Sequence, residues 1–116
     1  MKRFFDGFPS SAHPMAILSS MVTALSVFHP NSDSHEEQII DQNIVRLLAK
    51  VKTIAAYSYR KSHGLSFIYP NIDLSYVDNF LHMMFSDSEE KYHNNPIMSK
   101  ALNLLLMLHA DHEQNC

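Results

Sequence analysis

Apolar residues recur at helical spacing through most of the chain. Within residues 14–28 they occupy positions 15, 18, 21, 22, 25 and 28, and Pro14 suits the first turn of a helix. A second stripe runs from Ile39 to Val51, and the helical pattern continues through Tyr59 beyond a bend near residues 51–52. Two further helices are expected over residues 73–85 and from Pro96 onward.

Start and stop signals divide these stripes. Residues 29–31 (His-Pro-Asn) end the first helix, and His63-Gly64 ends the second. Ser34 with Glu37 three positions later is the signature of a capping box. Asp73 is expected to cap the third helix, and Asn95 before Pro96 to cap the last.

The remaining segments show no convincing strand pattern. Residues 1–13 are expected to be an irregular entry, and residues 65–71, which end near Pro70, an extended loop. The sequence therefore predicts an all-α chain of about five helices. Residues 97–108 are apolar on nearly every face, and a helix of that kind must be surrounded by other protein.

Composition narrows the class of protein. With 116 residues, 46% of them hydrophobic and 18% charged, the chain is a small globular domain or part of a larger one. Two glycines exclude a glycine-rich phosphate loop, and a net charge of −3 with scattered basic residues argues against nucleic acid as a partner. One cysteine and no long apolar run favour a soluble, cytoplasmic protein without membrane contact.

A dense polar cluster follows the last apolar helix at residues 109–116. His109 and His112 are three apart and would share one face of a helix. They could bind a metal, but the spacing matches neither His-Glu-x-x-His nor its inverse. They could instead stabilise the helix end, where cations are favoured. A third interpretation is an anion site in which the imidazoles hold a small dicarboxylate, oriented by Glu113 and Asn115.

Residues 109–115 (His-Ala-Asp-His-Glu-Gln-Asn) resemble the substrate-loop signature of citrate synthase. Other blocks are similar in order and spacing over nearly the whole chain, and closest to the bacterial branch that assembles as hexamers. These blocks are Ala12–Ala16, Arg46–Lys50, Thr53–Ala56, Phe67–Pro70, Asn79–Phe85 and Asn95–Ile97.

The resemblance implies an acyltransferase that condenses acetyl-CoA with oxaloacetate to give citrate and free CoA, with no cofactor. It implies that His112 contacts oxaloacetate and that His109 supports the pocket. Donors aimed at developing oxygen charge would stabilise the transition state. Residues 1–116 would form part of the large helical domain. The expected assembly is a homodimer or a hexamer-of-dimers type.

The family's enolising histidine, in a Gly-Pro-x-His-Gly-Gly motif, and its aspartate base have no counterpart in this sequence, nor does the small domain. We therefore expect the 116 residues alone to be inactive. Two alternatives stay open: a 2-methylcitrate synthase fragment, which would accept propionyl-CoA, and a non-catalytic truncated paralogue that acts as a helical interaction module.

Arg46 and Lys50 match a basic pair that the hexameric branch can use in an inhibitory NADH site. His29, Asp87 and Glu89 depart from the other positions of that site, and the acidic residues would repel a phosphate-bearing ligand. A solvated basic helix face is the preferred interpretation of the pair, with a nucleotide-effector site as the alternative.

Overall fold

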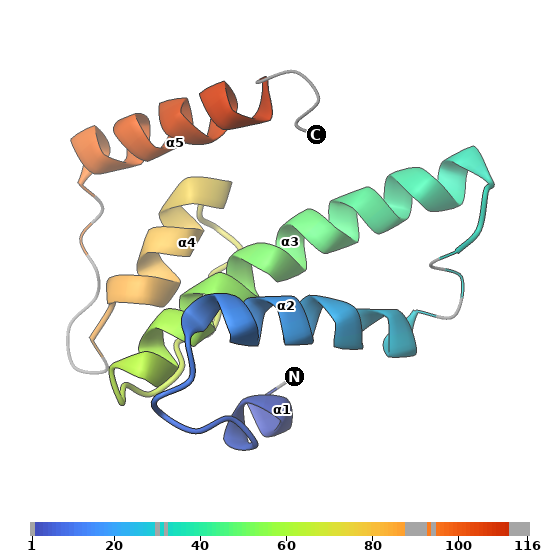
Figure 1. Cartoon of the computed structure of the whole chain (residues 1–116). Helices are drawn as coiled ribbons and strands as arrows, with labels where there is room; N and C mark the ends of the chain where they lie inside the picture. Colours follow the sequence, from blue (N-terminus) through green and yellow to red (C-terminus); the bar gives the residue numbers. More distant parts are fainter. Residues whose placement is uncertain (1, 30, 32, 88–92, 94, 112–116) are drawn as a thin grey trace. The chain divides into compact units, whose positions relative to one another are not determined.

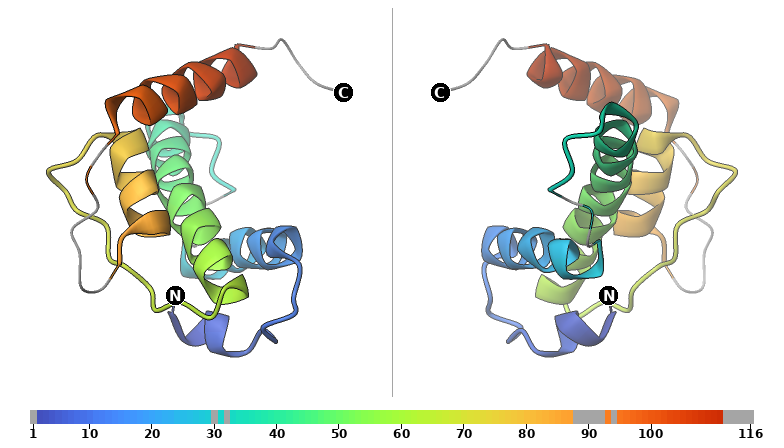
Figure 2. Two further views of the ribbon diagram at one scale, coloured as in Figure 1. Left: turned by 90° about the vertical axis from the view of Figure 1, so that its left-hand side faces the viewer. Right: turned by 90° about the vertical axis from the view of Figure 1, so that its right-hand side faces the viewer.

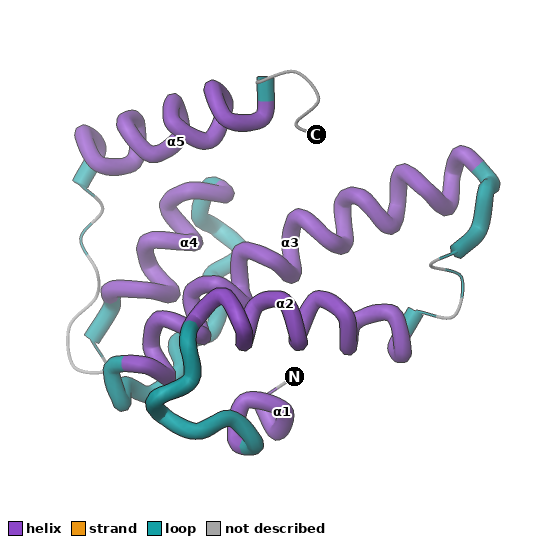
Figure 3. Tube along the Cα trace, in the orientation of Figure 1, coloured by secondary structure: helices purple, strands orange, loops and turns teal. Residues whose placement is uncertain are grey.

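The computed structural model describes residues 2–29, 31, 33–87, 93 and 95–111. In this part of the chain five α-helices and one 3-10 segment are joined by loops, and no strand occurs (Figures 1 and 3). The prediction of an all-α chain of about five helices is confirmed. The elements are α1 (Lys2–Asp6), α2 (Pro14–Leu25), η1 (Ser26–Phe28), α3 (Glu37–Ser62), α4 (Tyr76–Phe85) and α5 (Pro96–Ala110).

The helices form two compact units, residues 1–67 and 68–116. In the first unit α2 packs against α3 (Figure 2). The buried apolar side chains of α2 are Ile17 and Met21, and those of α3 include Ile54 and Tyr57. Burial is confined to the second half of α3, because Ile44 and Val45 in its first half are 51% and 66% exposed.

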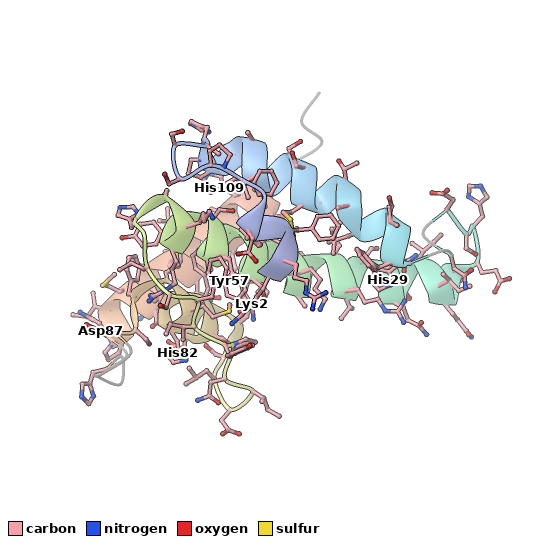
Figure 4. All side chains as sticks on the ribbon, turned by 90° about the horizontal axis from the view of Figure 1, so that it is seen from below. Lys2, His29, Tyr57, His82, Asp87 and His109 are labelled. Atoms are coloured by element: carbon pink, nitrogen blue, oxygen red, sulfur yellow. The ribbon has the colours of Figure 1, made fainter. Side chains whose placement is uncertain are left out.

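An aromatic cluster explains why residues 2–6 form a helix where an irregular entry was predicted. Phe5 of α1 is fully buried, with its ring edge-on to Tyr57 at 5.8 Å and to Phe67 at 5.3 Å. Tyr57 and Phe67 stack with their centroids 4.5 Å apart. The ammonium of Lys2 lies 5.9 Å from the Phe67 centroid, and Figure 4 labels Lys2 and Tyr57. Contacts distant in sequence therefore stabilise a helix too short to persist alone.

The boundaries of α3 match the sequence signals at one end only. Its C-terminus is a Schellman motif: Gly64 has φ +66°, and the Leu65 and Gly64 amides donate to the carbonyls of Arg60 and Lys61. The capping box predicted at Ser34 and Glu37 was wrong. Glu36 is the N-cap and its side chain makes no capping bond, while the Ser34 hydroxyl accepts from the Glu36 amide instead. Between residues 37 and 62 the helix is unbroken.

In the second unit the predicted cap of α4 was also wrong. The N-cap is Ser75, whose hydroxyl accepts from the Asp78 amide at 3.2 Å, and Asp73 lies in the preceding loop. Ser75 and Asp78 have the spacing of a capping box, so a local signal existed for this boundary. Residues 65–71 form the expected loop without a strand.

Helix α5 begins as predicted and is far less covered than predicted. Asn95 caps it, with its side-chain oxygen accepting from the amides of Ile97 and Met98. It packs against α4, yet none of its residues is fully buried and only Ser99 and Leu102 are half-buried. The apolar helix is therefore not surrounded within the described residues. No helix in this part of the chain has both the length and the hydropathy to cross a membrane.

Candidate functional site

The predicted polar cluster begins in the last turn of α5. His109 is exposed there, and its Nδ1 lies 2.7 Å from the carbonyl oxygen of Leu105, one turn earlier (Figure 4). A carbonyl oxygen can only accept a hydrogen bond, so Nδ1 carries the proton and donates it. The second ring nitrogen, Nε2, is then the atom of His109 that a ligand can meet.

The helix ends before the rest of the cluster. Ala110 is its last residue, and Asp111 is the C-cap, with its amide donating to Met107 at 3.0 Å. His109 and His112 would share a helical face only if the helix continued through both, and α5 ends at Ala110. Three of the four residues predicted for the pocket, His112, Glu113 and Asn115, lie outside the described residues. The fourth, His109, is the one that the structure places.

The described residues contain no group of three or more histidine, cysteine, aspartate and glutamate side chains that could hold a metal ion. His109 and Asp111 are the members of the cluster to which this finding applies. The second histidine of the metal interpretation, His112, lies outside those residues, and so do Glu113 and Cys116, either of which could supply a third ligand.

The basic pair lines a cavity in the first unit. Arg46 and Lys50 are one turn apart on α3, and the cavity of about 210 Å³ lies between α3 and the segment of α2, η1 and His29. Among the described residues its lining holds two basic side chains and no carboxylate, which suits an anion with an apolar part. The lining residues are Val22, Leu25, Ser26, His29, Asn43, Arg46, Leu47 and Lys50.

An apolar cavity of about 220 Å³ shares Leu25, His29 and Lys50 with the first. Phe4 and Phe28 meet edge-on in its wall, with their ring centroids 6.0 Å apart. The two cavities therefore place an aromatic-lined compartment beside a cationic one. The other lining residues are Met21 and Ala24.

Of two further polar lining residues, His29 had been named from the sequence as a departure from the effector site, whereas Asn43 had not been predicted. His29 follows η1 and is labelled in Figure 4, and no local spacing relates it to Arg46, seventeen residues later. Asn43 could have been noticed, because it stands three residues before Arg46 on the same helix. Its side-chain oxygen accepts from Arg46 Nη1 at 3.5 Å, and its Nδ2 donates to the Asn31 carbonyl at 3.2 Å.

Asp87, one of the two acidic residues that were expected to disfavour an effector, is not among the described residues that line this cavity. Asp87 follows α4 in the second unit, and Glu89 lies outside the described residues.

Comparison with known proteins decides the family. A family model described as "Citrate synthase, C-terminal domain" matches residues 1–116, the entire chain. The chain belongs to the citrate synthase family. Citrate synthase 1 of Mycobacterium tuberculosis, in strains CDC 1551 / Oshkosh and ATCC 25618 / H37Rv, is 50% identical to it over 117 residues.

The alignment covers all of this chain and 27% of each mycobacterial protein, so the chain spans about a quarter of these relatives. Membership confirms the resemblance predicted from residues 109–115 and the collinear blocks, and with it the relation to an acyltransferase. The roles of single residues in this chain remain predictions.

Proposed function

We propose that this chain supplies part of the oxaloacetate site of a citrate synthase, which condenses acetyl-CoA with oxaloacetate and water to citrate and CoA. The match of the family model over all 116 residues carries the proposal. The position of His109 supports it, because its exposed imidazole lies in the last turn of the helix that leads into the signature.

The residues of the signature have different roles in the proposed oxaloacetate site. His112 donates a hydrogen bond to oxaloacetate, and Glu113 and Asn115 orient the pocket. His109 supports the site through Nε2, since Nδ1 is held by the Leu105 carbonyl. To donate to a substrate oxygen through Nε2, this imidazole must carry both protons and a positive charge.

The 116 residues alone are inactive in this proposal, because the enolising histidine and the aspartate base of the family have no counterpart in them. Losing one acid–base group costs on the order of 10²–10⁴ in rate. The segment is part of the large helical domain of a cytoplasmic enzyme. That enzyme works as a homodimer or in the hexameric arrangement of the bacterial branch, and other parts of the assembly cover the apolar surface of α5.

A graft tests the proposal. Residues 1–116 replace the matching segment of mycobacterial citrate synthase 1, and CoA release is measured with acetyl-CoA and oxaloacetate. The graft should be active, and His112→Ala should lower kcat/KM for oxaloacetate by roughly 10²–10³-fold. His35→Ala, at an exposed position before α3, is the matched control and should change nothing. A folded but inactive graft, or an active graft indifferent to His112→Ala, would refute the proposal.

The two alternatives call for different experiments. Because the acyl-CoA pocket is not in this segment, a 2-methylcitrate synthase would be recognised only in a full-length enzyme that contains these residues, by its use of propionyl-CoA at least as well as acetyl-CoA. A non-catalytic interaction module would give an inactive graft, while the 116-residue chain would bind full-length synthase in sedimentation. The exposed apolar side chains that such binding requires include Leu104 and Leu106, which are 55% and 43% exposed.

The cavity beside Arg46 and Lys50 favours a second function, binding of a nucleotide effector such as NADH. At about 210 Å³ it lies below the roughly 300 Å³ at which small-molecule sites begin, so it would hold only a phosphate-bearing part of the ligand. NADH titration of the chain should show binding that Arg46→Gln with Lys50→Gln abolishes and Lys100→Gln does not. Absence of NADH binding would leave the pair as a solvated basic helix face.

A further inference from the structure

One carboxylate in the second unit joins the first turns of two helices. Asp78 lies in the first turn of α4, where its Oδ2 accepts a hydrogen bond of 2.6 Å from the N-cap hydroxyl of Ser75. Its other oxygen, Oδ1, accepts a 2.5 Å hydrogen bond from the hydroxyl of Ser99, in the first turn of α5. Asp78 and Ser99 are 21 residues apart in sequence, so this bond is a tertiary contact.

The bond falls on the least exposed part of α5. Ser99 and Leu102 are the two half-buried residues of this helix, and their spacing of three puts them on one face. The other residues of the helix are exposed, so its apolar side chains do little within this unit to fix its direction. A hydrogen bond to a carboxylate is directional and stronger than one between neutral groups. The hydrogen bond from Ser99 to Asp78 therefore constrains the direction of α5, which apolar packing alone does not fix.

We propose that Asp78 is a positioning residue that sets the direction and rotation of α5 through Ser99, and thereby the place of His109. This inference rests on the proposed function for its catalytic meaning, because His109 matters only if it supports the substrate pocket. The hydrogen bonds of Asp78 that support the inference do not depend on that function.

A small change in the direction of α5 at Ser99 produces a larger displacement at His109. His109 is ten positions after Ser99, which is about 15 Å along the axis and about 80° around it. A tilt of roughly 10° at Ser99 would move His109 by about 2–3 Å over that length. Displacements of about 1 Å in a binding constellation can cost about 10²-fold in rate. A constraint in the first turn is therefore effective at the other end of the helix.

The sequence indicates one of the two hydrogen-bond partners of Asp78. Ser75 and Asp78 have capping-box spacing, which explains a carboxylate at the start of α4 but not the partner of its second oxygen. The partner at Ser99 follows only from the fold. If the rest of a synthase covers α5, the carboxylate keeps two hydroxyl donors, and such donors are what a partly buried carboxylate requires.

Two nearly isosteric substitutions in the 116-residue chain test the proposal. Ser99→Thr keeps the hydroxyl and Ser99→Val replaces it by a methyl group, while both add the same β-branch to the helix. Amide exchange of α5 and residual dipolar couplings, which report the angle between α4 and α5, are measured for each variant. The His109 ring resonances are followed as the local probe.

We expect Ser99→Val and Asp78→Ala to speed α5 amide exchange by roughly tenfold, to change the couplings and to shift the His109 resonances. Ser99→Thr should preserve all three readouts, which a role in packing alone would not predict. Asp73→Asn, a change of charge in the preceding loop, is the control and should be silent. Equal behaviour of the Thr and Val variants, or unchanged couplings in Asp78→Ala, would overturn the proposal. An inactive graft would refute the proposed function and leave this result standing.

Discussion

The side chain of Asn79 pairs with the backbone of Asn71 as a neighbouring strand would. The Asn71 amide donates to Asn79 Oδ1 at 3.0 Å, and Asn79 Nδ2 donates to the Asn71 carbonyl at 2.8 Å. Asn79 is 6% exposed, so its carboxamide is largely shielded from water. One carboxamide thus satisfies both polar groups of a loop residue that has no strand partner, and fixes the loop to α4.

We expect Asn79→Ala to lower the free energy of unfolding by about 1–3 kcal/mol, because it removes both partners of the Asn71 backbone. Denaturant unfolding of the chain measures the loss, and faster exchange of the Asn71 amide locates it. Asn103→Ala, on the exposed side of α5, is the matched control and should change stability by less than about 0.5 kcal/mol. Equal effects of the two substitutions would show that the Asn79 bonds contribute nothing specific.

Asp78 makes the stability of the second unit depend on pH in the acid range, and the sign of that dependence can be predicted. The hydroxyls of Ser75 and Ser99 donate to its carboxylate and lower its pKa below the ordinary value of 3.8, although partial desolvation opposes this. A group whose pKa is lower in the folded state stabilises the fold above its unfolded pKa. That contribution is lost as the pH falls from about the unfolded value through the lowered one.

The stability difference between the natural chain and Asp78→Asn should therefore be constant near neutral pH and shrink below about pH 4. Denaturant unfolding at a series of pH values measures it. The same series for Asp73→Asn provides the comparison, because that carboxylate lies in the loop before α4. A difference that grows as the pH falls would contradict a lowered pKa at Asp78.

Local signals in the sequence predicted the end of α3 and the start of α5, whereas the caps predicted for the starts of α3 and α4 were wrong. Asn95-Pro96 and His63-Gly64 act within one or two turns, and both performed as expected. Long-range contacts were the source of the error at the N-terminus. Helix α1 depends on Phe5 meeting Tyr57 and Phe67, which are more than 50 residues away. No periodicity within residues 1–13 could reveal that partner.

The candidate site shows the same division. The signature at residues 109–115 identified the family from the sequence, and the family match confirmed it. The end of α5 at Ala110 and the hydrogen bond from His109 to Leu105 required the structure. The structure was also needed to show that His29 lies beside Arg46 and Lys50. These residues line one cavity although they come from segments on either side of a loop.

Gly64 is needed for its backbone conformation and not for lack of space. Its φ is +66°, and a Cβ built there would meet no atom within 4 Å. Gly64→Ala should therefore cost about 1–2 kcal/mol in the free energy of unfolding, from left-handed strain alone. Gly64→Asn should cost less, because asparagine tolerates this region. Thermal or denaturant unfolding compares the two, and an equal or larger loss in the Asn variant would point to a steric cause.

His109 offers a test that separates a pocket residue from a helix cap. Its Nδ1 is committed to the Leu105 carbonyl, so only Nε2 can act on a substrate. In His109→Asn the carboxamide nitrogen reaches about as far as Nδ1 and can keep the helix bond. In His109→Gln the longer side chain brings it near the position of Nε2. His109→Asn therefore tests the loss of Nε2, and His109→Gln tests the loss of Nδ1.

In the grafted synthase we expect His109→Asn to raise KM for oxaloacetate by about 10- to 100-fold, the effect of losing a hydrogen bond to a charged group. His109→Gln should raise it several-fold less. Steady-state kinetics at saturating acetyl-CoA measures both, with unfolding of each graft as the check on stability. The reverse order, with Asn the better substitute, would assign His109 to the end of α5 and leave substrate contact to His112 alone.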